Sequence, residues 1–250
     1  MPDWTFDTVL SGRDVGACTL GPSEAITAPR PSSVALVLAG EASVRDRSFA
    51  PGELIVAPGR EIVAGTEGCM LGTVRWDGAP PSSGARIEST VPRRFEKYES
   101  FQAQVSVRDG AADVIAPWEL YRVRMVAETR ERVQLHVHHV VTNLLFVPGE
   151  IGVPCGYLIV ARDGRVTARL LVGGDRAIVR PGHHHHVVPF RTGEPVEMIV
   201  FNDEASRYED VDRSDFHLVE SVPWGEIEIL DRPDPAPALT IVGPAPASGG

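Results

Sequence analysis

Seven of the eight histidines in this 250-residue chain fall in two short clusters. The first cluster contains His136, His138 and His139, and the second is the run 183–186 in the segment RPGHHHHVVP. Neutral imidazole is a common ligand of divalent transition metals, with metal–nitrogen bonds of about 2.0–2.1 Å. Two clusters of this kind therefore indicate a metal site.

The spacing of the first cluster suits a β-strand. Side chains alternate between the two faces of a strand, so His136 and His138 would share one face and His139 would take the other. Their ring nitrogens can converge on one ion, and a third histidine from another strand would complete a facial set with open positions. The alternative is that these histidines are structural, each satisfied by a hydrogen bond.

The segments that must position the histidines have the pattern of short β-strands. β-Branched runs recur between Gly and Pro residues, as in SSVALVLAG, ELIVAPG, RVQLHVHHVVTNLLFVPG, GYLIVARDG and VEMIVFND. Such spacing is typical of a β-sandwich or a β-barrel. Segment 93–104 (RRFEKYESFQAQ) is the best helix candidate.

Two other segments have the composition of connecting or terminal chain. Residues 76–86 (WDGAPPSSGAR) are rich in Pro, Gly and Ser, which indicates a linker or a long surface loop. The C-terminal segment DRPDPAPALTIVGPAPASGG predicts a disordered or loosely docked tail. Its apolar part, ALTIV, could instead pair with a sheet edge.

Charge and composition argue against several classes of function. The chain has 34 acidic and 24 basic residues, for a net charge of −10, whereas phosphate binding uses clustered basic residues. No signal peptide is visible, and no apolar run approaches the about 20 residues that span a bilayer. Cys18, Cys69 and Cys155 are an odd number and lie far apart, which does not suit a disulfide framework. We therefore expect a cytoplasmic protein with a small-molecule ligand and no nucleic-acid or membrane partner.

The second half of the chain resembles the cupin superfamily in two sequence motifs. In the first motif, three residues separate His138 from Thr142, and six more separate Thr142 from Gly149. The family has a ligating Glu where Thr142 stands. The resemblance therefore implies a metal site of neutral histidines that lacks the family's carboxylate.

The second motif places the third ligand. Five residues separate Gly174 from Arg180, and after Pro181-Gly182 two residues separate Gly182 from His185. The family has Pro where Arg180 stands and Asn where Pro189 stands. The resemblance implies that His185 is the ligand, and His183, on the same face of an extended segment, is the second candidate. His184 and His186 should then face away from the site.

The first half of the chain repeats the spacing of the two motifs but lacks their ligand residues. Ser33 lies seven residues before Gly40, and five residues separate Gly52 from Pro58. The four ligand positions fall on Thr27, Pro29, Ser33 and near Val63, which offer neither imidazole nor carboxylate. The resemblance implies an all-β fold of two cupin-type (jelly-roll) barrels. We expect a degenerate barrel without ligands over 1–78, a linker over 79–92, a metal-binding barrel over 93–228 and a tail over 229–250.

Several other residues are candidates for the chemistry. Arg122 and Arg124 lie two apart in LYRVRMV, and an inward arginine could clamp a substrate carboxylate with two hydrogen bonds. The alternative is that these arginines face solvent. Tyr157 is a candidate acid or hydrogen-bond donor. Residues 93–200 also resemble the ureidoglycolate lyase branch of the cupins, through Phe146, Pro148 and His185.

Three neutral histidines would leave a divalent ion with its full positive charge, which favours anionic or bidentate substrates. The resemblance to three-histidine cupin dioxygenases implies a non-haem metal oxygenase acting on a small acidic or chelating metabolite. It would use one divalent metal per chain, with Fe(II) favoured and Zn, Mn, Ni or Cu as alternatives. The alternatives in function are a lyase or isomerase of the ureidoglycolate lyase type and a ligand-binding bicupin without turnover. A homodimer is the expected assembly.

Overall fold

The computed structural model describes residues 2–10, 12–30, 32–57, 59–77, 93–94, 101–107, 114–115, 118–127, 129–139, 141–203, 217–232 and 234–243. Its regular elements are β-strands in three sheets, together with one short 3₁₀ turn, η1 (Trp224–Glu226). Among these residues, no helix is long and apolar enough to cross a membrane. Cys18, Cys69 and Cys155 are free thiols.

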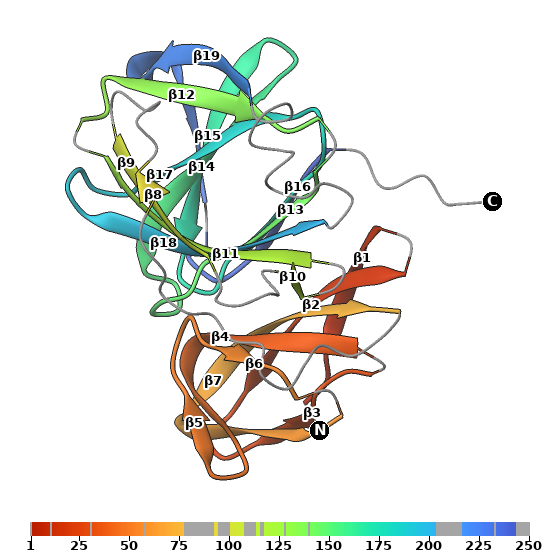
Figure 1. Cartoon of the computed structure of the whole chain (residues 1–250). Helices are drawn as coiled ribbons and strands as arrows, with labels where there is room; N and C mark the ends of the chain where they lie inside the picture. Colours follow the sequence, from red (N-terminus) through yellow and green to blue (C-terminus); the bar gives the residue numbers. More distant parts are fainter. Residues whose placement is uncertain are drawn as a thin grey trace.

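The first seven strands form one sheet that curls into a barrel, drawn in red and orange in Figure 1. They are β1 (Thr5–Leu10), β2 (Arg13–Leu20), β3 (Ala25–Thr27), β4 (Ser32–Val44), β5 (Arg47–Phe49), β6 (Leu54–Ile55) and β7 (Glu61–Trp76). The main path is β1-β2-β7-β4-β5, with β3 on β7 and β6 on β4. The long strands β4 and β7 bend where their register shifts near Gly40. Gly40 has φ 70°, and a Cβ there would collide with the carbonyl oxygen of Gly68.

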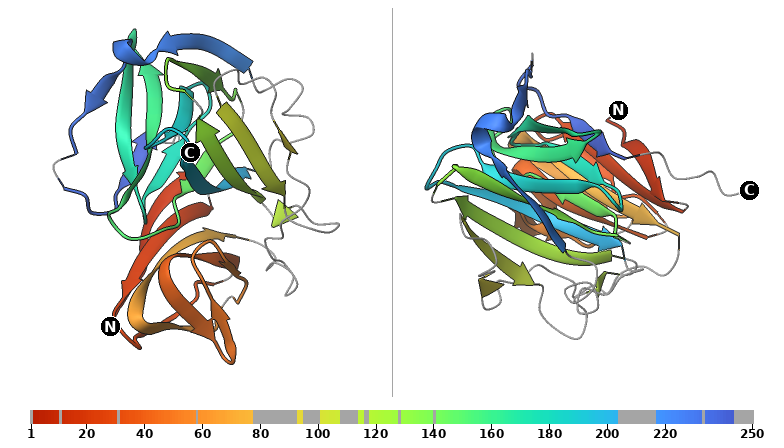
Figure 2. Two further views of the ribbon diagram at one scale, coloured as in Figure 1. Left: turned by 90° about the vertical axis from the view of Figure 1, so that its left-hand side faces the viewer. Right: turned by 90° about the horizontal axis from the view of Figure 1, so that it is seen from above.

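The second barrel is made of two sheets that face each other (Figures 1 and 2). The eight-stranded sheet contains β8 (Arg93–Arg94), β9 (Phe101–Val107), β10 (Val114–Ile115), β11 (Trp118–Ala127), β13 (Asn143–Phe146), β16 (Arg176–Val179), β18 (Pro195–Asp203) and β21 (Leu239–Val242). The six-stranded sheet contains β12 (Arg132–Val137), β14 (Pro154–Arg162), β15 (Arg165–Val172), β17 (His184–Pro189), β19 (His217–Pro223) and β20 (Glu228–Leu230).

Strands β13, β16 and β18 of the eight-stranded sheet carry apolar residues on both faces. Leu145 and Val147 project into the second barrel, where they pack with Leu158 and Val187 of the opposite sheet. Their neighbours on the chain project to the other face and pack against the first barrel; the shared cluster there contains Val34, Leu36, Leu38, Met70, Trp76, Leu144, Phe146, Ile178, Ile199 and Phe201. One continuous core therefore joins the two barrels.

The contact between the barrels is close at two places. A Cβ on Gly72 would come within 2.6 Å of the Phe146 ring, so a glycine is needed for the ring to pack on β7. The Phe146 ring also packs edge to face on Phe201, with centroids 5.6 Å apart. The backbone N–H of Gly149 donates to the carbonyl oxygen of Leu38 at 2.7 Å.

The helix predicted over 93–104 is wrong for the residues that the structure describes. Residues 93–94 belong to β8 and 101–104 to β9, while residues 95–100 lie outside the described residues. The segment 101–107 (FQAQVSV) alternates apolar and polar residues with period two, which is typical of a strand, and it pairs with β11. The linker predicted over 79–92 lies outside the described residues.

The tail is docked over its described part, contrary to the disordered alternative. Residues Leu239–Val242 pair with β16 as a parallel edge strand, which is the alternative that the sequence left open. The Arg232 guanidinium donates to the buried Asp175 carboxylate at 2.6 and 3.0 Å, which ties the tail to the second barrel.

Candidate metal centre

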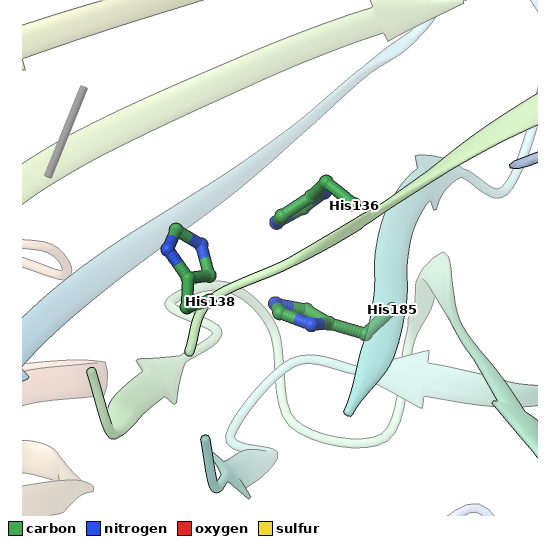
Figure 3. Close-up of side chains that lie close together, drawn as sticks. All are labelled: His136, His138 and His185. Carbon is green, nitrogen blue, oxygen red and sulfur yellow. The ribbon is translucent and has the colours of Figure 1, made fainter. Parts of the chain in front are cut away.

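Three of the predicted ligands converge inside the second barrel. One ring nitrogen each of His136, His138 and His185 lies within 4.8 Å of the other two. The ring centroids of His136 and His185 are 4.3 Å apart, and that of His138 is 5.1 and 5.6 Å from them. Figure 3 shows the three rings gathered around one space, two from the β12 segment and one from β17.

Strand pairing accounts for this convergence. His136 and His185 are direct cross-strand partners in β12 and β17, so their side chains project to the same face. His185 is also the partner of Val160, which lines the barrel interior. Gly182 begins the return to β17 with φ 79°, and its N–H donates to the carbonyl oxygen of His138 at 2.6 Å. This bond links the two histidine segments.

Burial keeps these imidazoles neutral. Desolvation, with the neighbouring histidines as a further cause, lowers the pKa of His185 to about 3 and that of His138 to about 4. The pKa of His136 lies well below 6.5, first because of burial and then because of His185, His138 and His186. Neutral rings have free lone pairs at neutral pH, so protons do not compete with a metal ion for them.

The donor set fits a divalent transition metal. Bonds of about 2.0–2.1 Å place the ligand nitrogens about 3.0–3.5 Å apart, so closing this set around an ion needs ring shifts of roughly 1 Å. The described members of the cluster are histidines without a carboxylate. A ligand set of this kind leaves the charge of the ion uncompensated and its remaining positions open.

His183 takes part through its backbone. Its carbonyl oxygen lies 2.9 Å from His185 Nδ1, which can donate to it and leave Nε2 of His185 for the ion. The His183 ring lies instead against Gly243, since a Cβ on that glycine would come within 2.6 Å of His183 Nε2. The structure therefore does not bring this predicted second candidate to the other three rings.

His186 contacts one of the three converging histidines, which the sequence did not predict. Its Nδ1 lies 3.2 Å from Nδ1 of His136, and the residue is 1% exposed. Strand alternation puts His186 beside Ile159 and Val188, on the outer side of the sheet. The described pairing of β12 with β17 is confined to His136 and His185, so the His186 ring can reach His136 where the strands diverge. The alternation of side chains along a strand, which is all that the sequence indicates, does not reveal such a contact.

Two of the predicted catalytic residues lie away from the histidines. Arg124 is exposed and pairs across the strands with Glu197, with Nε 3.8 Å from Oε1. Tyr157 packs with Phe190 and Trp224 in the outer cluster, because it is the partner of Val188 and not of an inward residue. Arg122 lies in β11, and its side chain is outside the described residues. Its catalytic role stays a prediction.

The carboxylate position of the first motif also needs correction. Strand β13 begins at Asn143, and Asn143 shares its inward face with Leu145 and Val147. Thr142 lies just before the strand and is 1% exposed. The structure thus gives the inward place to Asn143, one residue after the predicted position.

The first barrel has an apolar interior over its described residues. The inward residues of β3 and of the turn after it are Ile26 and Ala28, whereas Thr27 is exposed. Of the predicted ligand positions in this segment, Thr27 is therefore exposed and Pro29 is buried. Ser33 is buried, and its hydroxyl donates to the carbonyl oxygen of Pro29 at 2.7 Å.

No model of a protein family matches the chain, and no curated protein matches it. Among solved structures, it is similar to the vicilin of Corylus avellana (hazelnut), with 12% identity and a TM-score of 0.51 over 78% of this chain and 75% of that one. It is similar to the vicilin of Solanum lycopersicum (tomato), with 10% identity and a TM-score of 0.50 over 77% and 75%. A salicylate 1,2-dioxygenase from Pseudoaminobacter salicylatoxidans matches with 16% identity and a TM-score of 0.49 over 77% and 71%. At these identities the likeness to the two vicilins concerns the fold alone, and it supports the predicted all-β fold of two barrels.

Proposed function

We propose that the second barrel binds one divalent metal ion through His136, His138 and His185 and transforms a small acidic or chelating metabolite, as a non-haem metal oxygenase. The observation that carries this proposal is the convergence of three imidazoles, two buried and one half-buried, whose pKa values are all lowered. Fe(II) is the proposed ion, with Zn, Mn, Ni and Cu as alternatives. A bound ferrous ion would supply open positions for a chelating substrate and for O₂.

The residues around the site would orient the ligands. The carbonyl oxygen of His183 fixes the ring of His185, and His186 contacts the Nδ1 side of the His136 ring. Each contact would leave the Nε2 nitrogen available to the proposed ion. Leu145, Val147 and Val187 form apolar walls inside the barrel, which exclude bulk water from the site.

Metal analysis of the purified protein is the first test. We expect about one transition-metal ion per chain in the wild type and little in His136→Ala, His138→Ala or His185→Ala. His184→Ala is the matched control on the same strand, and it should retain the metal. A wild type that binds no Fe, Zn, Mn, Ni or Cu would contradict the proposed centre.

Oxygen uptake by the Fe(II)-loaded protein is the second test. Thiols, diketones and hydroxyaromatic acids form the substrate panel, and an oxygen electrode gives the rate. Substrate-dependent O₂ consumption would support an oxygenase. Conversion of a substrate under nitrogen would instead identify a Lewis-acid lyase or isomerase, and binding without conversion would identify a ligand-binding bicupin.

A further inference from the structure

Three carboxamide side chains face the interior that holds the histidines. Gln134 shares a face of β12 with His136, while Val133 and Leu135 on the other face belong to the outer cluster. Asn143 and Asn202 are direct partners in β13 and β18, on the opposite sheet.

The alternation of side chains along a strand also directs the two asparagines into the barrel. Leu145 and Val200, each two residues away on its strand, line the barrel interior, and Leu144 and Phe201 pack against the first barrel. Asn143 is 6% exposed and Asn202 is 2% exposed. Polar side chains from both sheets therefore meet the space between them.

The oxygens of these three side chains lack hydrogen-bond partners. Gln134 Oε1, Asn143 Oδ1 and Asn202 Oδ1 are each buried without a donor. A buried acceptor without a partner destabilises the folded protein, and a leucine in its place would avoid the penalty. Three such acceptors around the interior that holds the histidines indicate a site whose hydrogen bonds are completed by a ligand.

The charge of the interior selects the kind of ligand. Arg180, the one buried arginine among the described residues, donates to the carbonyl oxygen of Val9 in the first barrel. Arg124 faces outward beside Glu197. A second carboxylate on a substrate would thus find no buried cation in the described interior, whereas a hydroxyl or an amide N–H would find the three acceptors that lack partners.

We propose that Gln134, Asn143 and Asn202 bind the uncharged polar end of the substrate, a hydroxyl or carboxamide group, while its chelating end reaches the histidines. This inference rests on the proposed metal centre and adds the substrate class: a chelating acid with a neutral, hydrogen-bonding distal group. A dicarboxylate of the same size is disfavoured, because its distal charge would be buried without a counter-ion.

The test compares two probes of equal size on the protein loaded with one Co(II) per chain. Malate and its 4-amide, malamate, share a chelating 2-hydroxycarboxylate and differ only in the charge of the distal group. Titration followed by the Co(II) absorption spectrum gives both dissociation constants. We expect malamate to bind at least about 10-fold more tightly than malate.

Asn143→Leu and Asn202→Leu should each weaken malamate binding about 10-fold or more, and Asn202→Leu should leave the Co(II) affinity unchanged. Both should also raise the melting temperature of the metal-free protein, since each removes a buried acceptor without a partner. Thr73→Val is the matched control, because the buried Thr73 hydroxyl donates to the carbonyl oxygen of Val34 at 2.8 Å. It should lower the melting temperature and leave probe binding unchanged.

Asn143→Asp keeps the shape of the side chain if a leucine variant fails to fold, and it should shift the preference further toward malamate. A wild type with no preference for malamate, or leucine variants that bind it as the wild type does, would overturn the inference while the metal centre stands. Leucine variants less stable than the wild type would assign the asparagines a structural role. A wild type that binds no Co(II) would refute the proposed centre itself.

Discussion

The metal-free protein should lose stability steeply between pH 7 and pH 5. Burial lowers the pKa of His138 to about 4 and those of His185 and His186 to about 3. Unfolding returns these imidazoles to water, where their pKa is about 6.5. The unfolded chain then binds more protons than the folded protein from about pH 6.5 down to the folded pKa values. Stability is therefore complete above that window and falls as the pH falls through it.

The size of the effect follows from the shifts. At pH 5 an unfolded imidazole is almost fully protonated and the buried one is not, so each histidine costs about 2 kcal/mol relative to pH 7. Three histidines together lower the free energy of unfolding by about 6 kcal/mol between pH 7 and pH 5. The pKa of His136 is shifted in the same direction. Small domains have a free energy of unfolding of about 5–15 kcal/mol. We expect the metal-free protein to be close to acid unfolding at pH 5.

Urea unfolding in EDTA at pH 7, 6 and 5, followed by circular dichroism, measures this dependence. His138→Gln and His185→Gln each remove one titrating group, so each should reduce the slope of stability against pH by up to about 1.4 kcal/mol per pH unit. A free energy of unfolding that is equal at pH 7 and pH 5 would refute the reasoning. So would variants with the slope of the wild type.

Three other predictions concern the metal and the core. His186→Ala should lower metal affinity about 10- to 100-fold, because it removes the contact at Nδ1 of His136. Competition with a chromophoric chelator measures the affinity, and a value equal to that of His184→Ala would contradict the prediction. Elemental analysis should give one metal per chain, because the described interior of the first barrel is apolar; a value near two would contradict this. Phe146→Ala should lower the free energy of unfolding by about 3–5 kcal/mol, since the ring is 1% exposed between the barrels; a urea-unfolding loss below about 1 kcal/mol would show that the contact contributes little.

Sequence reasoning succeeded where a local pattern has one physical outcome. Period-two alternation and Gly/Pro punctuation predicted strands and barrels, and the spacing of His136, His138 and His185 predicted side chains that converge. The prediction failed where an outcome depends on which face of a strand becomes the interior. Arg124 and Tyr157 alternate as any strand residue does, and only the pairing of β11 with β18 and of β14 with β17 shows that they point outward.

Irregular positions in the strands account for the other details that the sequence did not predict. Register shifts in a sheet, as between Leu135 and His136, alter which residues oppose one another, and the sequence gives no sign of them. The contact of His186 with His136 depends on the divergence of β12 from β17, and the inward place of Asn143 depends on where β13 starts. A one-residue change in register reverses every inward and outward assignment on a strand, so these details needed the structure.

The first barrel contributes to the candidate metal centre through β13. This strand buries both faces: Asn143 and Leu145 face the histidine-containing interior, and Leu144 and Phe146 pack on the first barrel. Without that barrel, the outer face of the eight-stranded sheet would expose a large apolar surface to water. The bond from Gly149 N–H to the Leu38 carbonyl oxygen, just after β13, fixes the strand to the first barrel. The first barrel therefore helps to hold the inward asparagine in place even though its own interior offers no metal ligand among the described residues.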